Sequence, residues 1–291
     1  MELKKADLHL HTDASDDHID WPFRLPMKPI LSPLETYTLA KSRGMDYVTF
    51  TDHDTIDGAM RLHDALGKWP ADFFISEEIT AAYPGLEHDI HVNAFDITPS
   101  QHDAIQRLPR LEHGIHVGEL SKYLKREDIL YSWNHPFWSS TCSDIAMRTL
   151  DEIAEHFGVV EVRNGTRRKS LCDVAETLAY SKQAARVGGS DSHTYDAGLT
   201  YTLATGETPR EFLESIRKGE SAVEGLYGTE ERFVRDTAAL MKTNFRRAAQ
   251  RCGIATRAAL NGCERLGQLI APTIVRTYHR KQDRNLGRLY T

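Results

Sequence analysis

The chain of 291 residues lacks any long apolar run. Its longest apolar stretches near the C-terminal end, 269–271 and 273–275, fall far short of the roughly 20 residues that a transmembrane helix needs. The first residues, MELKKADLHLH, contain neither an apolar core nor a small-residue cleavage site of the kind found in secretory signals. We therefore expect a cytoplasmic protein without a transmembrane segment.

Cysteine is scarce as well. The chain has 4 cysteines, Cys142, Cys172, Cys252 and Cys263. Their wide and irregular spacing forms no CxxC pair and no disulfide framework, which is typical of proteins from a reducing compartment.

Positive charge is sparse in most of the chain and concentrated near its end. The net charge is −6, but residues 228–291 hold 13 Lys/Arg and 5 Asp/Glu, whereas residues 1–227 hold 23 and 37. This shift predicts a boundary near 225–228 between an acidic body and a basic C-terminal extension. Two apolar stripes at helical spacing predict helices at 229–251 and 255–270 in the extension.

Short apolar runs alternate with helical patterns through the body. We expect strands at 6–10, 46–51, 73–79, 90–95, 129–133, 159–162 and 186–189. We expect helices at 32–42, 55–66, 113–125, 145–156 and 169–185. This α/β order favours a parallel sheet, and about seven such units fit a closed or nearly closed β/α barrel.

One segment, residues 18–31, interrupts this pattern. It carries Pro22, Pro26 and Pro29, and three prolines so close together predict an absence of regular structure. The segment could be a lid over a pocket or a packed surface loop.

The residues with the clearest chemical meaning are His9 and His11. On extended backbone, positions i and i+2 face the same side, so both imidazoles can point at one metal ion. Five further clusters rich in His or acid residues follow expected strands: 51–55, 77–78, 88–91, 134–136 and 188–193. Alternation also places Asp89 on the same face as His91.

These clusters are expected to meet at one place. In a β/α barrel the carboxyl ends of the strands converge on one face, where the active site lies. Burying so many charged groups together is very costly unless metal ions are bound among them. The sequence therefore predicts a metal-dependent hydrolase.

The motifs DLHLHT, TDHDT, SEEIT, HDIHVNAF, NHPF and GGSDSH resemble, in order and spacing, those of the PHP (polymerase and histidinol phosphatase) superfamily. The resemblance covers about residues 5–225 and leaves out the basic extension. It implies a distorted (β/α)7 TIM-like barrel over residues 1–227, followed by a helical extension at 228–291. It also implies a trinuclear metal site at the C-terminal face of the strands.

Three ligand groups follow from the resemblance: His9, His11, Glu78 and Asp191; Glu78, His91 and His135; and Asp16, His53 and His193. Glu78 is preferred over Glu77 because the family's glutamate precedes Ile-Ser/Thr, as Glu78 precedes Ile79 here; Glu77 would face solvent or stand behind the ligands. Asp7 and Asp52 are expected to orient ligating histidines.

The resemblance further implies a metal-dependent phosphoesterase acting on a small phosphomonoester or nucleotide. Two to three divalent ions (Zn, Mn or Fe) would supply a hydroxide nucleophile held by Glu78, Asp191 and His193. A basic stretch after the strand at 159–162 could bind a second phosphate or a carboxylate, or be a solvated loop; its arginines are Arg163, Arg167 and Arg168.

Two other functions remain open. The same metal chemistry would serve hydrolysis of a non-phosphate ester or amide. Alternatively, the basic C-terminal helices could bind nucleic acid, a protein partner or a membrane surface. For nucleotide or RNA substrates, Trp21, Phe23 or Trp138 could stack on a base.

Overall fold

The computed structural model describes residues 2–20, 24–86, 88–137 and 147–251, together with short stretches between 265 and 277. The expected stacking residues Trp21, Phe23 and Trp138 lie outside the described residues, as does most of the expected helix 255–270.

The described strands form two larger sheets and one hairpin. The seven-stranded sheet has the order β11-β10-β9-β6-β5-β8-β7, with bounds Ala185–Gly189, Val159–Asn164, Leu130–Trp133, Asp89–Phe95, Ser76–Ala82, Gly114–His116 and Arg110–Leu111. The four-stranded sheet has the order β13-β12-β1-β4, with bounds Ser221–Gly225, Thr200–Thr205, Leu3–Asp7 and Tyr47–Val48.

The expected closed or nearly closed barrel of parallel strands is not confirmed for the described residues, which form two sheets that both contain antiparallel pairs. β5, β6 and β9 pair antiparallel, and so do β1, β12 and β13. The loop between β5 and β6 spans only residues 83–88, which is too short for the crossover helix of a parallel pair. The two sheets approach each other through isolated pairs such as Leu10–Ser192 and His53–Glu78, so the fold is mixed α/β with two sheets.

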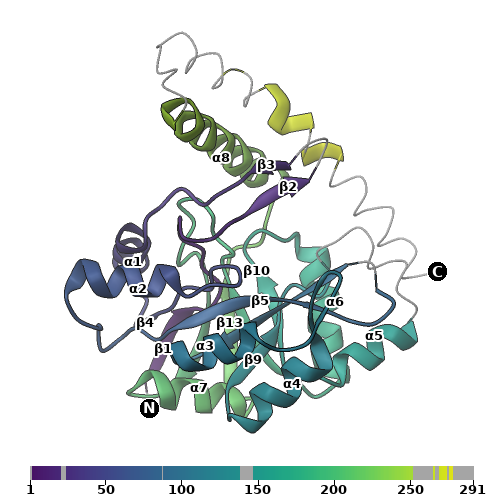
Figure 1. The fold of residues 1–291 in the computed structure, drawn as a ribbon. Helices are drawn as coiled ribbons and strands as arrows, with labels where there is room; N and C mark the ends of the chain where they lie inside the picture. The colour runs from purple at the N-terminus through teal and green to yellow at the C-terminus, as the bar shows by residue number, and fades with distance from the viewer. Residues whose placement is uncertain are drawn as a thin grey trace.

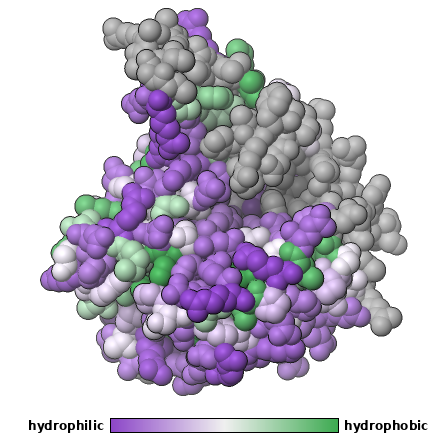
Figure 2. Space-filling model, in the orientation of Figure 1, coloured by the Kyte–Doolittle hydropathy of each residue, from purple (hydrophilic) through white to green (hydrophobic). Residues whose placement is uncertain are grey.

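Helices lie around these sheets, except for the last one, which lies beside the hairpin (Figure 1). In chain order they are α1 Pro33–Ser42, α2 Asp57–Leu66, α3 Pro99–Gln106, α4 Val117–Arg126, α5 Met147–Ala154, α6 Lys169–Ser181, α7 Pro209–Arg217 and α8 Glu230–Arg251. Within the described part of the chain, no helix is long and apolar enough to cross a membrane. Figure 2 shows a mainly hydrophilic face with small apolar patches.

Local sequence signals account for several helix boundaries. The expected helix at 32–42 is confirmed: Ser32 caps α1, and its partner Glu35 completes a capping box. α3 and α7 were not expected from the sequence, although Thr98-Pro99 and Thr208-Pro209 supply the same signal of a capping hydroxyl followed by proline at the first turn. The structure thus contains helices that hydrophobic periodicity alone does not reveal.

The proline-rich segment 18–31 does contain regular structure, contrary to the expectation. β2 (His18–Asp20) pairs antiparallel with β3 (Arg24–Pro26). A two-stranded hairpin accepts this because Pro26 ends an edge strand, where a missing N–H is tolerated. The hairpin lies beside α8, on the side of the sheets opposite α4 and α7 (Figure 1). α8 itself confirms the expected helix at 229–251.

Candidate metal centre

His9 and His11 lie just beyond β1 rather than on a strand from 6 to 10, because β1 ends at Asp7. Their backbone is nevertheless extended against residues 191–192: the Asp191 N–H donates to the His9 carbonyl (2.8 Å), and the His11 N–H donates to the Ser192 carbonyl (3.3 Å). The two rings lie on the same side with centroids 5.1 Å apart. The i, i+2 spacing therefore correctly predicts that the two rings lie on the same side, although the strand ends two residues before His9 and not at residue 10.

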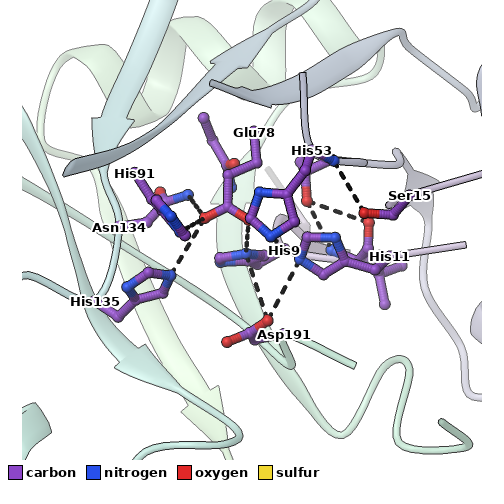
Figure 3. Close-up of polar contacts among 12 residues, drawn as sticks. His9, His11, Ser15, His53, Glu78, His91, Asn134, His135 and Asp191 are labelled. Carbon is purple, nitrogen blue, oxygen red and sulfur yellow. Dashed lines mark hydrogen bonds and ion pairs between the residues drawn. The ribbon is translucent and has the colours of Figure 1, made fainter. Parts of the chain in front are cut away.

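Glu78, on β5, is the centre of the cluster (Figure 3). Its carboxylate is 1% exposed and lies among five imidazoles, at 3.1 Å from His9, 3.2 Å from His11, 3.4 Å from His53, 3.1 Å from His91 and 3.2 Å from His135. Asn134 donates a further hydrogen bond to Glu78 Oε1 (2.9 Å). One glutamate is thus surrounded by nitrogen donors from both sheets.

Four overlapping groups place potential ligand atoms within 4.8 Å of one another: His9, His11 and Asp191; His9, Glu78 and His135; His53, Glu78 and His91; and His11, Asp17, His53 and His193. Two parts of the cluster differ in their supports. The sheet half consists of Glu78, His91 and His135, on or directly after β5, β6 and β9. The loop half consists of Asp17, His53 and His193, on the segments after β1, β4 and β11. His9, His11 and Asp191 lie between the halves.

The structure brings Asp17 into the cluster in place of the expected Asp16. Asp16 is exposed, whereas Oδ1 of the next residue, Asp17, lies 3.1 Å from His53 Nε2 and 2.9 Å from His193 Nε2. The backbone explains the shift by one residue. The Ser15 N–H donates to the Thr12 carbonyl in a turn, and the Asp17 carbonyl accepts from the Met27 N–H, which together direct Asp17 inward.

Asp7 and Asp52 hold backbone rather than histidine rings. The Asp7 carboxylate accepts the amides of Ser190 (2.8 Å), Gly198 (2.7 Å) and His9 (3.3 Å). Asp52 accepts the amide and the hydroxyl of Thr12 (2.6 and 2.8 Å). Burial raises the pKa of both carboxyls to about 6, against the lowering effect of these hydrogen bonds. Each aspartate therefore fixes the chain next to a histidine and leaves the ring to other partners.

The rings are oriented by two other carboxylates. Glu161, on β10, accepts from His9 Nδ1 (2.9 Å) and from the His135 amide (2.8 Å). Asp89 contacts His91 Nε2 at 3.0 Å, on the face that alternation predicts. Sequence reasoning missed Glu161, although a single carboxylate inside the apolar run 159–162 was a usable signal.

Glu77 is neither solvent-facing nor part of the cluster. It is buried on the other side of β5, where its carboxylate lies 2.7 Å from His102 Nδ1. Burial raises the pKa of Glu77, while the hydrogen bond to His102 opposes that effect. Glu77 and Glu78 are therefore adjacent in sequence but serve different parts of the fold.

Of the three expected substrate-binding arginines, Arg167 contacts the cluster. Its Nη2 is 3.5 Å from Asp191 Oδ2, an oxygen that also accepts from Thr166 and Asn164. Arg167 borders a small pocket that also includes His135 and Phe137. Arg163 instead stacks over the Tyr227 ring at 4.6 Å, and Arg168 stands at the start of α6.

Opposite charges stabilise each other within the cluster. Burial lowers the pKa of His9, but the carboxylates of Glu78, Glu161 and Asp191 raise it to well above its ordinary value. Burial raises the pKa of Glu78, yet the surrounding histidines hold it well below the usual range. In the same way, despite burial, carboxylates raise the pKa of His91 to about 10 and that of His193 to about 9.

The donor set fits divalent metal ions. His11 faces His193 with ring centroids 4.3 Å apart and His53 at 4.9 Å, so protons on neighbouring rings would repel one another. A cation between neutral imidazoles and ionised carboxylates removes that repulsion, and such a mixed nitrogen and oxygen set suits Zn, Mn or Fe.

Comparison with known sequences gives one short match. No family model matches the chain. A stretch of 75 residues is 32% identical to an uncharacterized protein of Methanocaldococcus jannaschii; it covers 26% of this chain and 43% of that protein, so the match spans less than half of the relative's length.

Two solved structures share the fold at low sequence identity. A two-domain protein from Bacteroides vulgatus that contains a predicted PHP-like metal-dependent phosphoesterase has a TM-score of 0.53 at 18% identity, over 84% of this chain and 69% of that one. The lesion-specific endonuclease EndoQ from Pyrococcus furiosus has a TM-score of 0.51 at 14% identity, over 76% of this chain and 58% of that one. The chain therefore shares its fold with a protein described as PHP-like, in agreement with the resemblance that the motifs carry.

Proposed function

We propose that this protein is a metal-dependent phosphoesterase that hydrolyses a small phosphomonoester or a nucleotide. The observation that carries the proposal is the position of Glu78, a fully buried carboxylate that five histidines surround. The fold shared with a protein that contains a predicted PHP-like phosphoesterase adds support.

Two to three divalent ions would be held by the four overlapping groups, with Asp17 in the role first expected for Asp16. When bound, such ions lower the pKa of water to near 7 and neutralise phosphoryl oxygens. Glu78, Asp191 and His193 are the residues that we propose border the attacking water. Glu161 and Asp89 keep the His9 and His91 rings in place, so the site needs little rearrangement when substrate enters.

Arg167 is the residue that we propose binds a second anionic group of the substrate. Its side chain is 12% exposed and lies beside His135 at the pocket. A guanidinium matches the two oxygens of a phosphate or carboxylate, and its loss should mainly weaken substrate binding. Arg163, held on Tyr227, offers a matched control. We expect Arg167→Ala to raise KM about 10-fold with little change in kcat, while Arg163→Ala changes either value much less.

A substrate panel tests the proposed reaction. The purified protein, reconstituted with Mn²⁺ or Zn²⁺, would be assayed on phosphomonoesters, nucleotides, single-stranded nucleic acid, carboxylic esters and amides, with elemental analysis in parallel. Hydrolysis confined to the first two classes is the expected result. Turnover only of carboxylic esters or amides would establish the alternative metallohydrolase. Fewer than two metal ions per chain would contradict the site itself.

A further inference from the structure

Residues 27–31 join the two sides of the loop half. The Met27 N–H donates to the Asp17 carbonyl (2.8 Å), and the Ile30 N–H donates to the His193 carbonyl (2.9 Å). Asp17 and His193 are far apart in sequence, yet a single five-residue segment fixes the backbone of both. The relative position of Asp17 and His193 therefore depends on this segment.

Helix α8 holds this segment in place. Arg247 donates to the Pro29 and Ile30 carbonyls, each at 2.9 Å, and Asn244 donates to the Lys28 carbonyl at 2.9 Å. Met27 packs with Leu240 and Met241 in a small apolar cluster of its own. Polar and apolar contacts thus attach residues 27–31 to one face of α8.

A second connection runs from α8 to the loop that carries His193. Arg232 and Arg235 both bind the Asp196 carboxylate, at 2.8 and 2.6 Å, and the Thr194 hydroxyl donates to Asp236 at 3.1 Å. Asp196 and Arg232 are 13% and 16% exposed, so their ion pair is shielded from solvent more than an ordinary surface pair, whereas Arg235 is 55% exposed. The basic extension meets the acidic body at the residues that follow a potential ligand.

The arginines of α8 that make these contacts also determine how much of its positive charge is available to a partner. Arg232, Arg235 and Arg247 are engaged with carboxylates or carbonyls of the body. They are therefore less available to an external polyanion than the composition of residues 228–291 alone suggests. This observation favours a role within the molecule over nucleic-acid binding.

We propose that α8 is a positioning element that sets the metal affinity of the group formed by His11, Asp17, His53 and His193. The inference rests on the proposed metal-dependent function. α8 acts through the backbone of residues 27–31 and 193–196, whereas the sheet half is held by the β5–β6–β9 pairing. Weakening α8 should consequently affect one bound ion and spare the others.

The experiment uses the full chain with Asn244→Ala and Arg247→Ala combined. A matched control combines Gln250→Ala and Arg251→Ala, which removes one amide and one guanidinium from exposed positions of the same helix. Metal-free proteins would be titrated with Co²⁺ and followed by visible absorption, which reports each coordinated ion without any activity assay. We expect the double variant to bind one Co²⁺ equivalent about 10-fold or more weakly, and the control to match the wild type.

A second variant guards against a general loss of folding. Arg247→Lys keeps the charge but cannot span the Pro29 and Ile30 carbonyls, so we expect the same single equivalent to weaken by a smaller factor. Equal weakening of every Co²⁺ equivalent, or wild-type binding in both variants, would overturn the inference alone. A wild-type protein that binds no Co²⁺ would instead overturn the proposed function, and the inference with it.

Discussion

The two halves of the candidate centre are built from similar side chains but supported in different ways. In the sheet half, Glu78 lies within the paired strand β5 and His135 comes just after β9, and their side chains are 1% and 3% exposed. In the loop half, His53 and His193 are each 21% exposed and depend on segments without regular structure. A site can thus combine a part that strand pairing holds with a part whose geometry depends on contacts with neighbouring segments.

This difference has a thermodynamic meaning. A ligand set held by strand pairing loses little conformational entropy when an ion binds, whereas loop residues must be ordered first. The sheet half should therefore bind its ion more tightly than the loop half. The following predictions test that contrast, from the largest expected effect to the smallest.

Replacing Glu78 should weaken metal binding in the sheet half and the loop half alike, because Glu78 contacts histidines of both halves. We expect Glu78→Gln to lower kcat/KM by about a thousandfold or more, corresponding to several kcal/mol of lost charge stabilisation, and to reduce metal content throughout. Steady-state kinetics and elemental analysis would measure both effects. Glu77→Gln, which alters the neighbouring carboxylate on the opposite face, is the control; full metal content in Glu78→Gln would refute the central role of this residue.

Replacing Asp17 should affect the loop half alone. We expect Asp17→Asn to lower kcat/KM by about 10²-fold, because one charged ligand is lost, while the sheet half keeps its ion. The adjacent substitution Asp16→Asn should change kcat/KM less than about 2-fold, since surface substitutions have small effects. If Asp16→Asn proved the more damaging change, the assignment to Asp17 would be wrong.

Glu161 tests how the ring of His9 is held. We expect Glu161→Gln to weaken metal binding about 10- to 100-fold, because the carboxylate that orients His9 Nδ1 and the His135 amide loses its charge. Competition with a chelator would measure the affinity. A variant that binds metal like the wild type would show that β10 only packs beside the centre.

The pH dependence of stability should distinguish metal-free from metal-loaded protein. In the metal-free state the pKa values of His91 and His193 are about 10 and about 9, above the ordinary 6.5. Their ion pairs therefore stabilise fully below pH 6.5 and are lost as pH rises through 9 to 10. Metal binding requires deprotonated imidazoles and strengthens over the same range.

Between pH 6.5 and 9, the free energy of unfolding that metal binding adds should grow. We expect the difference in Tm between the loaded and metal-free proteins to widen by about 2–4 °C or more for each kcal/mol of that increase. Calorimetry at several pH values would measure it. His193→Asn should remove the contribution of the loop half and leave that of His91. A difference that stays constant or narrows with pH would contradict this account.

The features that the sequence predicts correctly are those that depend on the geometry of neighbouring residues. The relation of His9 to His11 and of Asp89 to His91 follows from alternation along extended backbone, and it did not depend on where the strand ends. The cap at Ser32 likewise depends only on neighbouring residues. Motif order then indicated which segments meet, and the shared fold agrees with it.

The remaining features depend on distant contacts. Nothing near Asp16 and Asp17 shows which carboxylate faces inward, because the Asp17 backbone is set by Met27. Glu161 resembles any strand residue until β10 is placed beside His9. The antiparallel pairs around β6 could not be predicted from hydrophobic periodicity, because the pattern of a strand does not show whether its neighbour runs parallel or antiparallel to it.

Helix α8 has a consequence for how the protein is made. A ribosome synthesises all the residues of the proposed centre, up to His193, before residues 230–251 emerge, and folding begins during synthesis. The sheet half can form on an unfinished chain, but the contacts that fix residues 27–31 cannot. Completion of the centre is thereby coupled to the synthesis of α8, and a chain cut before Glu230 would carry every proposed ligand without the helix that aligns the loop half.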